Sequence, residues 1–400
     1  TPRGIGKAGK GALSSMHPQH LGAAVLKAIA ERNKINTAEV DDIIWGTSSQ
    51  RGTQGGDLGR MAALDAGYDV KSSAVTLDRF CGSGITSVNI AASSVMSGME
   101  DLVLAGGTEM MSTYGQDGNT PSPFMDNGNT RLRSEHPQPH QGVCADAIAT
   151  LEGIDREAVD ALAFVSQQNA DKAIKGGHFD KSLIPVYNAE GELVLDKEEF
   201  PRPQTTLEGL AELKASFESL ADYPLDEQGS TFRKLVLQKY PDLKINHVHH
   251  AGNSSGVVDG AAALLLASPN YAKANGMKPR ARIKAMANMG DSPTLMLNAP
   301  VPAAKKVLEK ANLTIDDIDL FEVNEAFSVV TEKFIRDLNI DRDKINVNGG
   351  AMALGHPIGA TGSILVGTVL DELERRDLQF GLVTMCAAGG MAPAVIIERV

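Results

Sequence analysis

The chain has only three cysteines among its 400 residues, and Cys81, Cys144 and Cys386 lie far apart. Neither a disulfide framework nor a zinc site built on closely spaced cysteines is therefore expected. No run approaches the roughly 20 consecutive apolar residues of a membrane-spanning helix, and we expect no secretory leader. We therefore expect a cytoplasmic protein without a membrane span, whose thiols stay reduced.

Positive charge is also scarce, because 38 Lys and Arg residues stand against 50 Asp and Glu residues and give a net charge of −12. This balance excludes a broad electropositive surface for nucleic acid. Any phosphate that the protein binds must be held locally. With 42% hydrophobic residues, the 400-residue chain can bury a large core, and we expect about two or three domains.

The sequence repeats itself once, at an interval of roughly 275 to 280 residues. Segments 20–46 and 300–324 each predict a helix, a short connection and a buried strand. Segments 72–96 and 344–370 each predict a strand, a turn of small residues and a helix. The repeat therefore predicts a duplicated α/β domain, with helices covering mostly parallel sheets.

Residues 112–246 differ in composition from the two repeats, because Gly, Pro, Asn and Ser are dense near their start. We expect an inserted loop or lid domain there. It would separate an N-terminal half, residues 1–111 completed by 247–267, from a C-terminal half, residues 268–400.

Two helices are predicted inside this insertion. The first carries an apolar stripe made of Val159, Leu162, Ala163 and Val165. The second opens where Thr205 and Glu208 have the spacing of a capping box. The insertion is therefore expected to have helical structure of its own.

Cys81 stands in the run DRFCGSG, at a predicted turn from a strand to a helix. The positive end of the following helix is expected to stabilise a thiolate and lower its pKa into the reactive range. Backbone N–H groups at the same turn can receive an oxyanion. The position suits a nucleophile, and a small buried cysteine in a tight turn is the structural alternative.

His356 lies in GHPIGATG, which occupies in the second repeat the place that FCGSG holds in the first. If the halves pack about a pseudo-twofold axis, the two turns meet. His356 can then accept the Cys81 proton and later donate a hydrogen bond to a carbonyl oxygen. A histidine that only packs in the core is the structural alternative.

Two further residues follow predicted strands of the second repeat. Cys386 precedes the flexible turn AAGGM, so a second thiol in the same crevice can act as a base, unless it is structural. Asn324 can orient a water toward the crevice or cap a helix. Cys144 lies inside a helical pattern and is expected to be structural.

Three histidines, His247, His249 and His250, lie close together in INHVHHAGN. Such a cluster can bind a metal, but the sequence offers no second group of ligands. We therefore expect a strand with alternating faces at this segment, and no metal.

Seven motifs resemble those of the thiolase family, the acetyl-CoA C-acyltransferases, and they occur in the family's order. They are DRFCGSG, LAGGTEMMS, RPQTTLEGLAEL, HAGNSSGVVDGAAALLL, FEVNEAF, GGAMALGHPIGATG and CAAGGM. The resemblance spans essentially the whole chain. It implies a five-layer αβαβα duplicated fold of the α/β class, whose inserted loop domain covers coenzyme A.

The resemblance also implies an activity and the residues behind it. The activity is ping-pong acyl transfer through a Cys81 thioester, as thiolytic cleavage of a 3-ketoacyl-CoA or the reverse Claisen condensation. His356 is implied to activate Cys81, and Cys386 to deprotonate acetyl-CoA. His356 and a water held by Asn324 would polarise one thioester carbonyl, and backbone N–H groups of Cys81 and Ala388 would receive the other.

Substrate contacts follow from the same resemblance. Ser255 is implied to bond the pantetheine amide, and His140 and Met296 to line the channel. Acyl-CoA, acetyl-CoA and coenzyme A are the implied partners, with no resident cofactor and no metal, in a homodimer or homotetramer.

The chain departs from the family pattern at several places. Ala388 replaces a customary glycine, and Gln141 replaces the methionine of an HMG motif. Residues 217–251 are longer than in compact biosynthetic members and resemble thiolases that act on bulky, sterol-derived acyl-CoAs. The family's first strand precedes the turn with which this chain opens, so a strand is expected to be missing from the first sheet.

Two other functions compete with this interpretation. A ketosynthase-like condensing enzyme shares the architecture, but it has a histidine at the Asn324 position and no thiol at the Cys386 position. A non-catalytic acyl-CoA-binding homologue is disfavoured because every reactive group is retained. Acyl-chain length and the physiological direction are not specified by the sequence.

Overall fold

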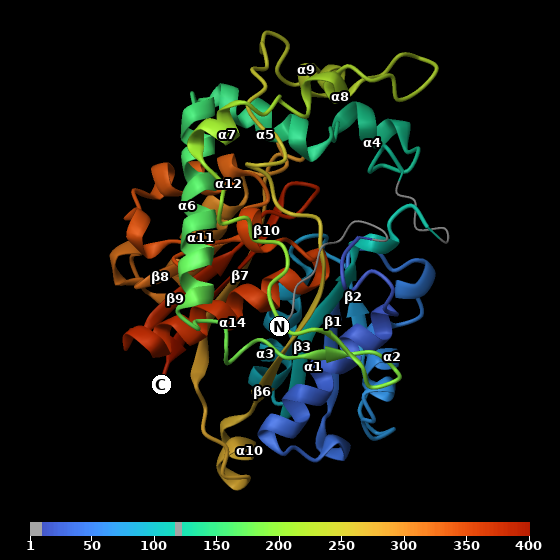
Figure 1. Ribbon diagram of the computed structural model, residues 1–400, viewed down its shortest axis with the longest axis vertical. Helices are drawn as coiled ribbons and strands as arrows, with labels where there is room; N and C mark the ends of the chain where they lie inside the picture. Colours follow the sequence, from blue (N-terminus) through green and yellow to red (C-terminus); the bar gives the residue numbers. More distant parts are fainter. Residues whose placement is uncertain (1–9, 117–121) are drawn as a thin grey trace.

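The computed structural model describes residues 10–116 and 122–400, and two four-stranded sheets form its centre (Figure 1). Residues 1–9 of the N-terminal half and 117–121 of the insertion lie outside the described residues. The first sheet has the order β2-β1-β3-β6, from β1 (Asp42–Gly46), β2 (Val75–Leu77), β3 (Leu102–Met110) and β6 (Asp259–Ala267). The second has the order β7-β10-β9-β8, from β7 (Ala281–Gly290), β8 (Leu320–Val323), β9 (Phe380–Thr384) and β10 (Met391–Arg399).

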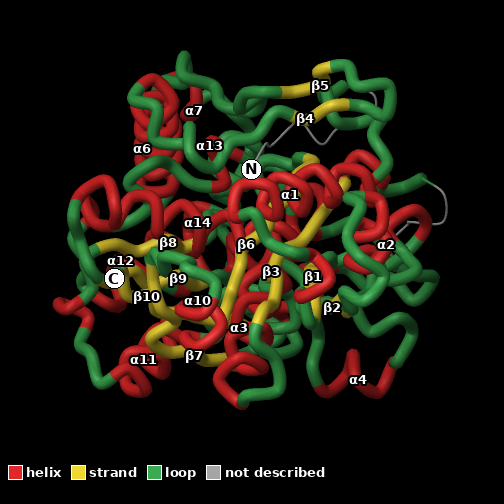
Figure 2. The backbone as a smooth tube through the Cα atoms, turned by 90° about the horizontal axis from the view of Figure 1, so that it is seen from below, coloured by secondary structure: helices red, strands yellow, loops and turns green. Residues whose placement is uncertain are grey.

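Helices form three layers around these sheets (Figure 2). Helices α3 (Ser83–Ser97) and α14 (Ile358–Arg376) pack against each other and contact strands of both sheets. The outer face of the first sheet is covered by α1 (Pro18–Asn33) and α2 (Leu58–Asp65). Helices α11 (Pro300–Ala311) and α12 (Ser328–Leu338) cover the second. The predicted five-layer αβαβα arrangement is confirmed.

The predicted duplication is also confirmed, because α1, β1, α3, β3 and β6 correspond in order to α11, β8, α14, β9 and β10. Strands β2, β1 and β3 run parallel, as do β8 and β9. Strand β10, however, is antiparallel to both β9 and β7, so the expectation of mostly parallel sheets is wrong for the second sheet. The reason is the short connection between β9 and β10, which can join only antiparallel neighbours.

The two sheets differ at one edge. Strand β7 pairs with the edge of β10 that faces away from β9. Strand β6 corresponds to β10, yet among the described residues no strand occupies the equivalent place on β6, which pairs only with β3. The strand that the sequence analysis expects to be missing from the first sheet would lie at this edge of β6.

The middle layer depends on glycines at the crossing of α3 and α14. A Cβ atom on Gly362 would lie 2.1 Å from the backbone nitrogen of Ile85, and one on Gly84 would lie 2.7 Å from the nitrogen of Gly362. Both distances are far below van der Waals contact. The small residues of GATG and CGSG therefore allow the two helix backbones to touch.

The insertion forms a helical region above the sheets, at the top of Figure 1. Its longest helix is α6 (Arg156–Lys175), which packs against α12 and against α13 (Ala351–Leu354). The other helices of the insertion are α4 (Thr130–Glu135), α5 (Gln141–Leu151), α7 (Leu207–Ala211), α8 (Glu218–Ala221) and α9 (Phe232–Leu237). Its two short strands, β4 (Val186–Tyr187) and β5 (Leu193–Leu195), pair with each other, and β4 contacts α1. Helix α10 (Pro269–Ala274) lies outside the insertion, between β6 and β7, at the bottom of Figure 1. No helix in the described part of the chain is long and apolar enough to cross a membrane.

Two details of the predicted helices are wrong. Val165 is 47% exposed, because the buried side of α6 continues from Val159 and Ala163 to Ser166 and Ala170. The cap of α7 is Thr206, whose hydroxyl accepts from the Gly209 nitrogen. The hydroxyl of Thr205 instead donates to the carbonyl of Arg202, so the capping box does not form.

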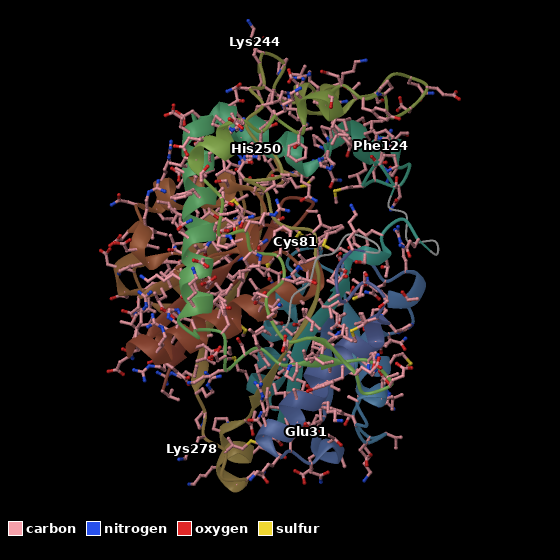
Figure 3. All side chains as sticks on the ribbon, in the orientation of Figure 1. Glu31, Cys81, Phe124, Lys244, His250 and Lys278 are labelled. Carbon is pink, nitrogen blue, oxygen red and sulfur yellow. The ribbon has the colours of Figure 1, made fainter. Side chains whose placement is uncertain are left out.

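The three clustered histidines do not form the expected strand, since residues 247–250 pair through their side chains. His247 and His249 each place Nδ1 2.7 Å from the buried carboxylate of Asp146 in α5. His250 places Nε2 2.8 Å from Asp160 in α6. Figure 3 shows His250 near the helical region, above Cys81. The imidazoles therefore fasten this segment to the insertion.

Candidate active site

Four segments that are far apart in the sequence meet below the insertion. A Cβ atom on Gly82 would lie 3.3 Å from the Cβ of Ala387, so the residues that follow Cys81 and Cys386 are neighbours. The backbone nitrogen of Asn324 donates to Thr384, two residues before Cys386. The backbone nitrogen of His356 donates to Gly256, which adjoins Ser255. Figure 3 shows Cys81 at the centre of the molecule.

Cys81 lies on a tight turn immediately before α3. Phe80 has a φ of +48°, a left-handed conformation that is costly for a bulky residue. The turn is held because the backbone nitrogen of Ser83 donates to Phe80, and the hydroxyl of Ser83 donates to the same carbonyl at 2.7 Å. The predicted strand-to-helix turn is therefore present, and it presents the thiol at the end of a helix.

The expected lowering of the Cys81 pKa is not found. Cys81 is only 6% exposed, and burial raises the pKa of its thiol well above the ordinary range. The nearby Cys386 and Glu109 act in the same direction when they are ionised. Because desolvation outweighs the stabilisation from the helix end, a base is needed to remove the proton.

His356 meets the requirements of such a base. Burial lowers its pKa to about 4, so the ring is neutral near pH 7. Its Nδ1 lies 2.6 Å from the hydroxyl of Thr361, which itself donates to the carbonyl of Pro357. The hydroxyl therefore accepts the Nδ1 proton, and Nε2 keeps its lone pair. Sequence reasoning missed Thr361, although its place one turn into the following helix was a usable signal.

Asn324 lies beside His356. Its side-chain nitrogen is 3.5 Å from Nε2 of His356, and its buried Oδ1 has no hydrogen-bond partner among the described groups. The structural alternative, a helix cap, is wrong because the residue that caps α12 is Phe327. The side chain is thus available to a group in the crevice.

Cys386 follows β9 and is 1% exposed. Burial raises the pKa of its thiol to about 12. The chain then turns through Ala388, Gly389 and Gly390, and both glycines have left-handed φ values, of 79° and 80°. Cys144 lies in α5, fully buried, with Sγ 3.3 Å from the carbonyl of Thr294, as expected for a structural cysteine.

The expected substrate-contacting residues lie around the same place. The backbone nitrogen of Ser255 donates to Ala326, and Met296 belongs to the apolar cluster that contains Cys386. His140 caps α5 through Nδ1, which accepts from Gly142, and its ring centre is 5.6 Å from those of Phe217 and Phe232. Burial lowers the pKa of His140, so this aromatic cluster is uncharged near pH 7.

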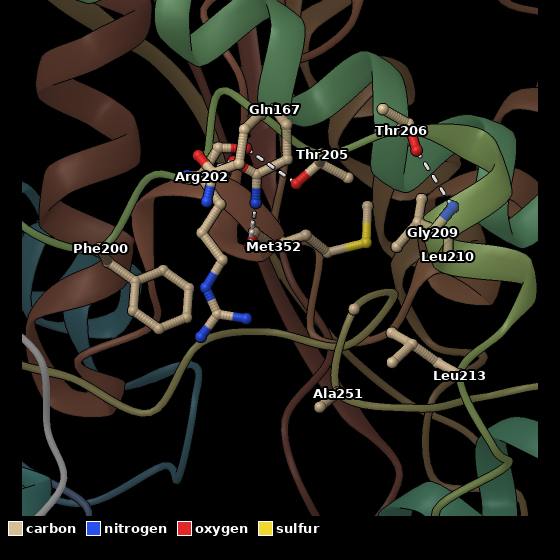
Figure 4. A pocket seen from close by; sticks show the side chains of 12 residues that line it. Gln167, Phe200, Arg202, Thr205, Thr206, Gly209, Leu210, Leu213, Ala251 and Met352 are labelled. Atoms are coloured by element: carbon tan, nitrogen blue, oxygen red, sulfur yellow. Dashed lines mark hydrogen bonds between the residues drawn. The ribbon is translucent and has the colours of Figure 1, made fainter.

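A hollow of about 240 Å³ opens beside this region (Figure 4). Its walls include Phe200, Arg202 and Met352, and its floor includes Ala251 and Gly252, a few residues before Ser255. The guanidinium of Arg202 lies 5.2 Å from the centre of the Phe200 ring. No carboxylate of the described residues forms an ion pair with it. A cation beside an aromatic ring is suited to a phosphate-bearing ligand.

The histidine cluster has no geometry of a metal centre, because its members face two separate carboxylates. Within residues 10–116 and 122–400, no group of three or more His, Cys, Asp and Glu side chains is arranged to hold a metal ion. The three histidines therefore act as hydrogen-bonding groups that join this segment to α5 and α6.

Two family models match the chain. The thiolase N-terminal domain matches residues 3–220, and the thiolase C-terminal domain matches residues 277–399.

Relatives over nearly the full length include the beta-ketoadipyl-CoA thiolase of Acinetobacter baylyi, at 38% identity over 98% of this chain and 96% of that protein. A steroid 3-ketoacyl-CoA thiolase of Mycobacterium tuberculosis is 37% identical over 99% of this chain and 91% of that protein. The crystal structure of the Bacillus anthracis acetyl-CoA acetyltransferase superposes with a TM-score of 0.84 at 32% identity, covering 100% of this chain and 96% of that one.

Proposed function

The chain belongs to the thiolase family, and from this premise we propose which of its residues carry out acyl transfer. The protein is an acyltransferase that cleaves a 3-ketoacyl-CoA with coenzyme A or runs the reverse condensation. One observation carries the assignment of residues. The turns after Cys81 and Cys386 are in contact, and Asn324, whose backbone donates to Thr384, lies beside Nε2 of a neutral His356.

In the first half-reaction, the sulfur of Cys81 attacks the 3-keto carbon while its proton passes to Nε2 of His356. The bond between C2 and C3 then breaks. The acyl group stays on Cys81 as a thioester, and the electron pair leaves as the enolate of acetyl-CoA. The thiol of Cys386 protonates this enolate at C2 and becomes a thiolate. A thiol whose pKa is raised to about 12 matches the weak acidity of such a carbon acid.

In the second half-reaction, the thiol of coenzyme A gives its proton to the Cys386 thiolate and its sulfur attacks the Cys81 thioester. Cys81 leaves as a thiolate and recovers its proton from the His356 imidazolium. Two oxygens develop negative charge: we assign the enolate oxygen of acetyl-CoA to His356 and a water held by Asn324, and the oxygen on the carbon bonded to Cys81 to the backbone N–H groups of Cys81 and Ala388. Each such donor contributes roughly 3 kcal/mol. The scheme requires no resident cofactor or metal.

The nucleophile is tested by mass spectrometry after brief exposure to a 3-ketoacyl-CoA. We expect an acyl adduct on Cys81 in the wild-type protein. Cys386→Ala should still take up an acetyl group on Cys81 from acetyl-CoA, but it should lose condensation and exchange of the acetyl-CoA α-proton by more than about 1000-fold. Cys144→Ala, which removes a buried thiol outside the crevice, is the matched control and should retain both activities. Turnover with unmodified Cys81 would remove the proposal, and equal loss of both steps in Cys386→Ala would reverse the assigned roles.

We further propose that the hollow beside Ser255 receives the phosphate-bearing end of coenzyme A, while Ser255, His140 and Met296 border the pantetheine and acyl parts. Arg202→Gln should raise KM for coenzyme A by about tenfold with kcat nearly unchanged, because the contact is made equally in the ground and transition states. Arg131→Gln is the control, since Arg131 is 86% exposed on α4. A change in kcat alone would contradict this placement.

The acyl specificity within the family is a separate question. The relatives named above act on ketoadipyl and steroid acyl groups by name, and Gln141 brings a polar side chain to the start of α5. Comparing kcat/KM for acetoacetyl-CoA, a long-chain 3-ketoacyl-CoA and a polycyclic one tests the proposal that the acyl group is bulky. The polycyclic substrate should have the highest value.

We propose finally that the protein is a homodimer, alone or as half of a tetramer, built on the open edge of β2. Val75 on this edge, Phe80 on the next turn and Ile90 on α3 are large apolar side chains, exposed by 45%, 36% and 44%. A second copy of the same edge is the proposed occupant, because two identical edges can pair about a twofold axis. We also propose that the protein is located in the cytoplasm.

A further inference from the structure

Glu109 is a fully buried carboxylate near the end of β3, outside the set of residues that the mechanism uses. One oxygen, Oε2, accepts from the backbone nitrogens of Ser48 and Gly359, both at 2.8 Å. The other, Oε1, accepts from three side chains, which are Thr47 at 3.2 Å and Gln54 at 2.8 Å in the N-terminal half and Tyr114 at 3.1 Å at the start of the insertion. Every partner can donate, and these hydrogen bonds oppose the burial that raises the pKa of the Glu109 carboxyl.

Only one of these five donors belongs to the other half of the molecule. Gly359 is the second residue of α14 and lies three residues after His356. Its N–H is one of the groups that a helix start leaves without an internal partner, and a carboxylate at that end is favoured by the helix dipole. The side chain of Glu109 therefore reaches from the first sheet to the first turn of the helix that follows His356.

The surrounding backbone leaves no room for this turn to shift. A Cβ atom on Gly107 would lie 2.1 Å from the carbonyl oxygen of Gly359, and one on Gly359 would lie 2.5 Å from the carbonyl oxygen of Gly46. The Ser363 hydroxyl donates to the Gly84 carbonyl and joins α14 to α3, and the backbone nitrogen of His356 donates to Gly256, which precedes β6. Neither of these two links reaches the sheet. Among the described contacts between the first turn of α14 and the first sheet, the bond to Glu109 is thus the hydrogen bond, and the contacts of the glycines are van der Waals contacts.

We propose that Glu109 is a positioning residue for His356. By fixing the Gly359 N–H, it fixes the turn that contains Pro357 and Thr361, and these two residues hold Nδ1 of the imidazole. The proposed base, Nε2, is thereby held by a frame that belongs to the half carrying Cys81. The inference rests on the proposed role of His356 as the base.

A double-mutant cycle tests whether Glu109 acts through His356. The readouts are the rate of Cys81 acylation by the 3-ketoacyl-CoA and the rate of Cys81 alkylation by iodoacetamide. Glu109→Ala and His356→Ala should each slow both reactions by about 100-fold, the usual contribution of a general base. Adding Glu109→Ala to His356→Ala should cause no further loss of rate, because without the imidazole Glu109 has no base left to position. KM for the thioester should stay within a factor of about three.

Conservative variants distinguish the length of the Glu109 side chain from its charge. Glu109→Gln keeps an oxygen at full length for the two backbone N–H groups, whereas Glu109→Asp keeps the charge on a side chain one methylene shorter. Positioning predicts that Gln is within about tenfold of wild type and that Asp is slower than Gln. A purely electrostatic role predicts the opposite order. This comparison also decides the matter if Glu109→Ala does not fold.

Asp259→Ala is the matched control. Asp259 is equally buried, lies opposite Met110 on the neighbouring strand and accepts from the backbone and hydroxyl of Ser112, so the hydrogen bonds of its carboxylate go to Ser112 and not to the first turn of α14. Its folded fraction should react at the wild-type rate. Additive losses in the cycle, or equal losses in Asp259→Ala, would overturn the proposal. If wild-type Cys81 takes up no acyl group while the alkylation cycle is non-additive, the proposed function fails and the positioning role stands.

Discussion

Protonation of the His356 imidazole at low pH destabilises the folded protein, because the ring is held in a site that does not accommodate its charged form. The ring is 4% exposed, and the Thr361 hydroxyl takes its Nδ1 proton while Asn324 faces Nε2. Burial therefore lowers the pKa to about 4, compared with about 6.5 in an unfolded chain. The same burial that keeps the base neutral for catalysis links it to stability.

The sign of this linkage gives a prediction for His356. Because the folded-state pKa lies below the unfolded value, the unfolded chain binds the proton first as pH falls. The free energy of unfolding should therefore decrease by about 3 kcal/mol between pH 6.5 and pH 4 from this residue alone. Urea denaturation of wild type and His356→Asn at several pH values measures it. The difference in free energy of unfolding between the two proteins should change by that amount between pH 6.5 and pH 4. If the free energies of both proteins changed equally with pH, the assignment would be contradicted.

At the scale of residues, the sequence predicted the reactive groups better than the residues that hold them. Cys81 and His356 stand out because they occupy equivalent turns of an internal repeat. Thr361 offered only its place one turn into the following helix, and Glu109 carries no sequence signal. Their roles depend on hydrogen bonds whose partners are set by packing, and Glu109 lies 250 residues from Gly359. The pKa direction of Cys81 was predicted wrongly because a helix end is visible in sequence, whereas the depth of burial is not.

At the scale of elements, the contact between α3 and α14 determines how the two halves meet. These helices begin just after Cys81 and His356, so their crossing point sets the separation of the two reactive turns. Glycines at the crossing allow the backbones to touch. A side chain there would have to push the helices apart, and the separation of the turns would grow with it.

Two glycines of α14 offer a matched test of this contact. Gly362→Ala places a Cβ atom 2.1 Å from the nitrogen of Ile85 and should lower the free energy of unfolding by more than about 2 kcal/mol. Gly367→Ala has no atom within 4 Å of the new Cβ and should raise it by about 0.5–1 kcal/mol, through helix propensity. Denaturant midpoints measure both. Equal effects of the two substitutions would show that the crossing is not tightly packed.

Periodicity predicted that elements exist but not where their faces lie. The helix at α6 was predicted, yet Val165 is exposed because the helix packs on α12 and α13 through a stripe that includes Ser166. Residues 247–250 resembled a strand by alternation. They pair instead with Asp146 and Asp160, whose proximity arises only when the insertion folds over them.

At the scale of the whole molecule, the duplicated architecture followed from the repeat, while strand direction did not. The repeat shows that each half contains the same helices and strands in the same order. Strands β6 and β10 are both the last strand of their repeat, and each is antiparallel to the strand before it in the sheet. The repeat does not show that the insertion separates β6 from β3, whereas β10 follows β9 after a short turn. The pairing is thus preserved although the connection differs.

The open edge of β2 leads to the prediction for assembly. A charged residue at a self-pairing edge repels its own copy across the twofold axis, so Val75→Glu combined with Ile90→Glu should weaken the dimer by more than about 100-fold in Kd. The control is Met99→Glu, because Met99 is even more exposed, at 77%, but lies beyond the far end of α3. Sedimentation velocity over a range of concentrations measures the assembly. We expect wild type and Met99→Glu to sediment as dimers or tetramers and the double variant as a smaller species, and a wild-type monomer or an unchanged double variant would refute this interface.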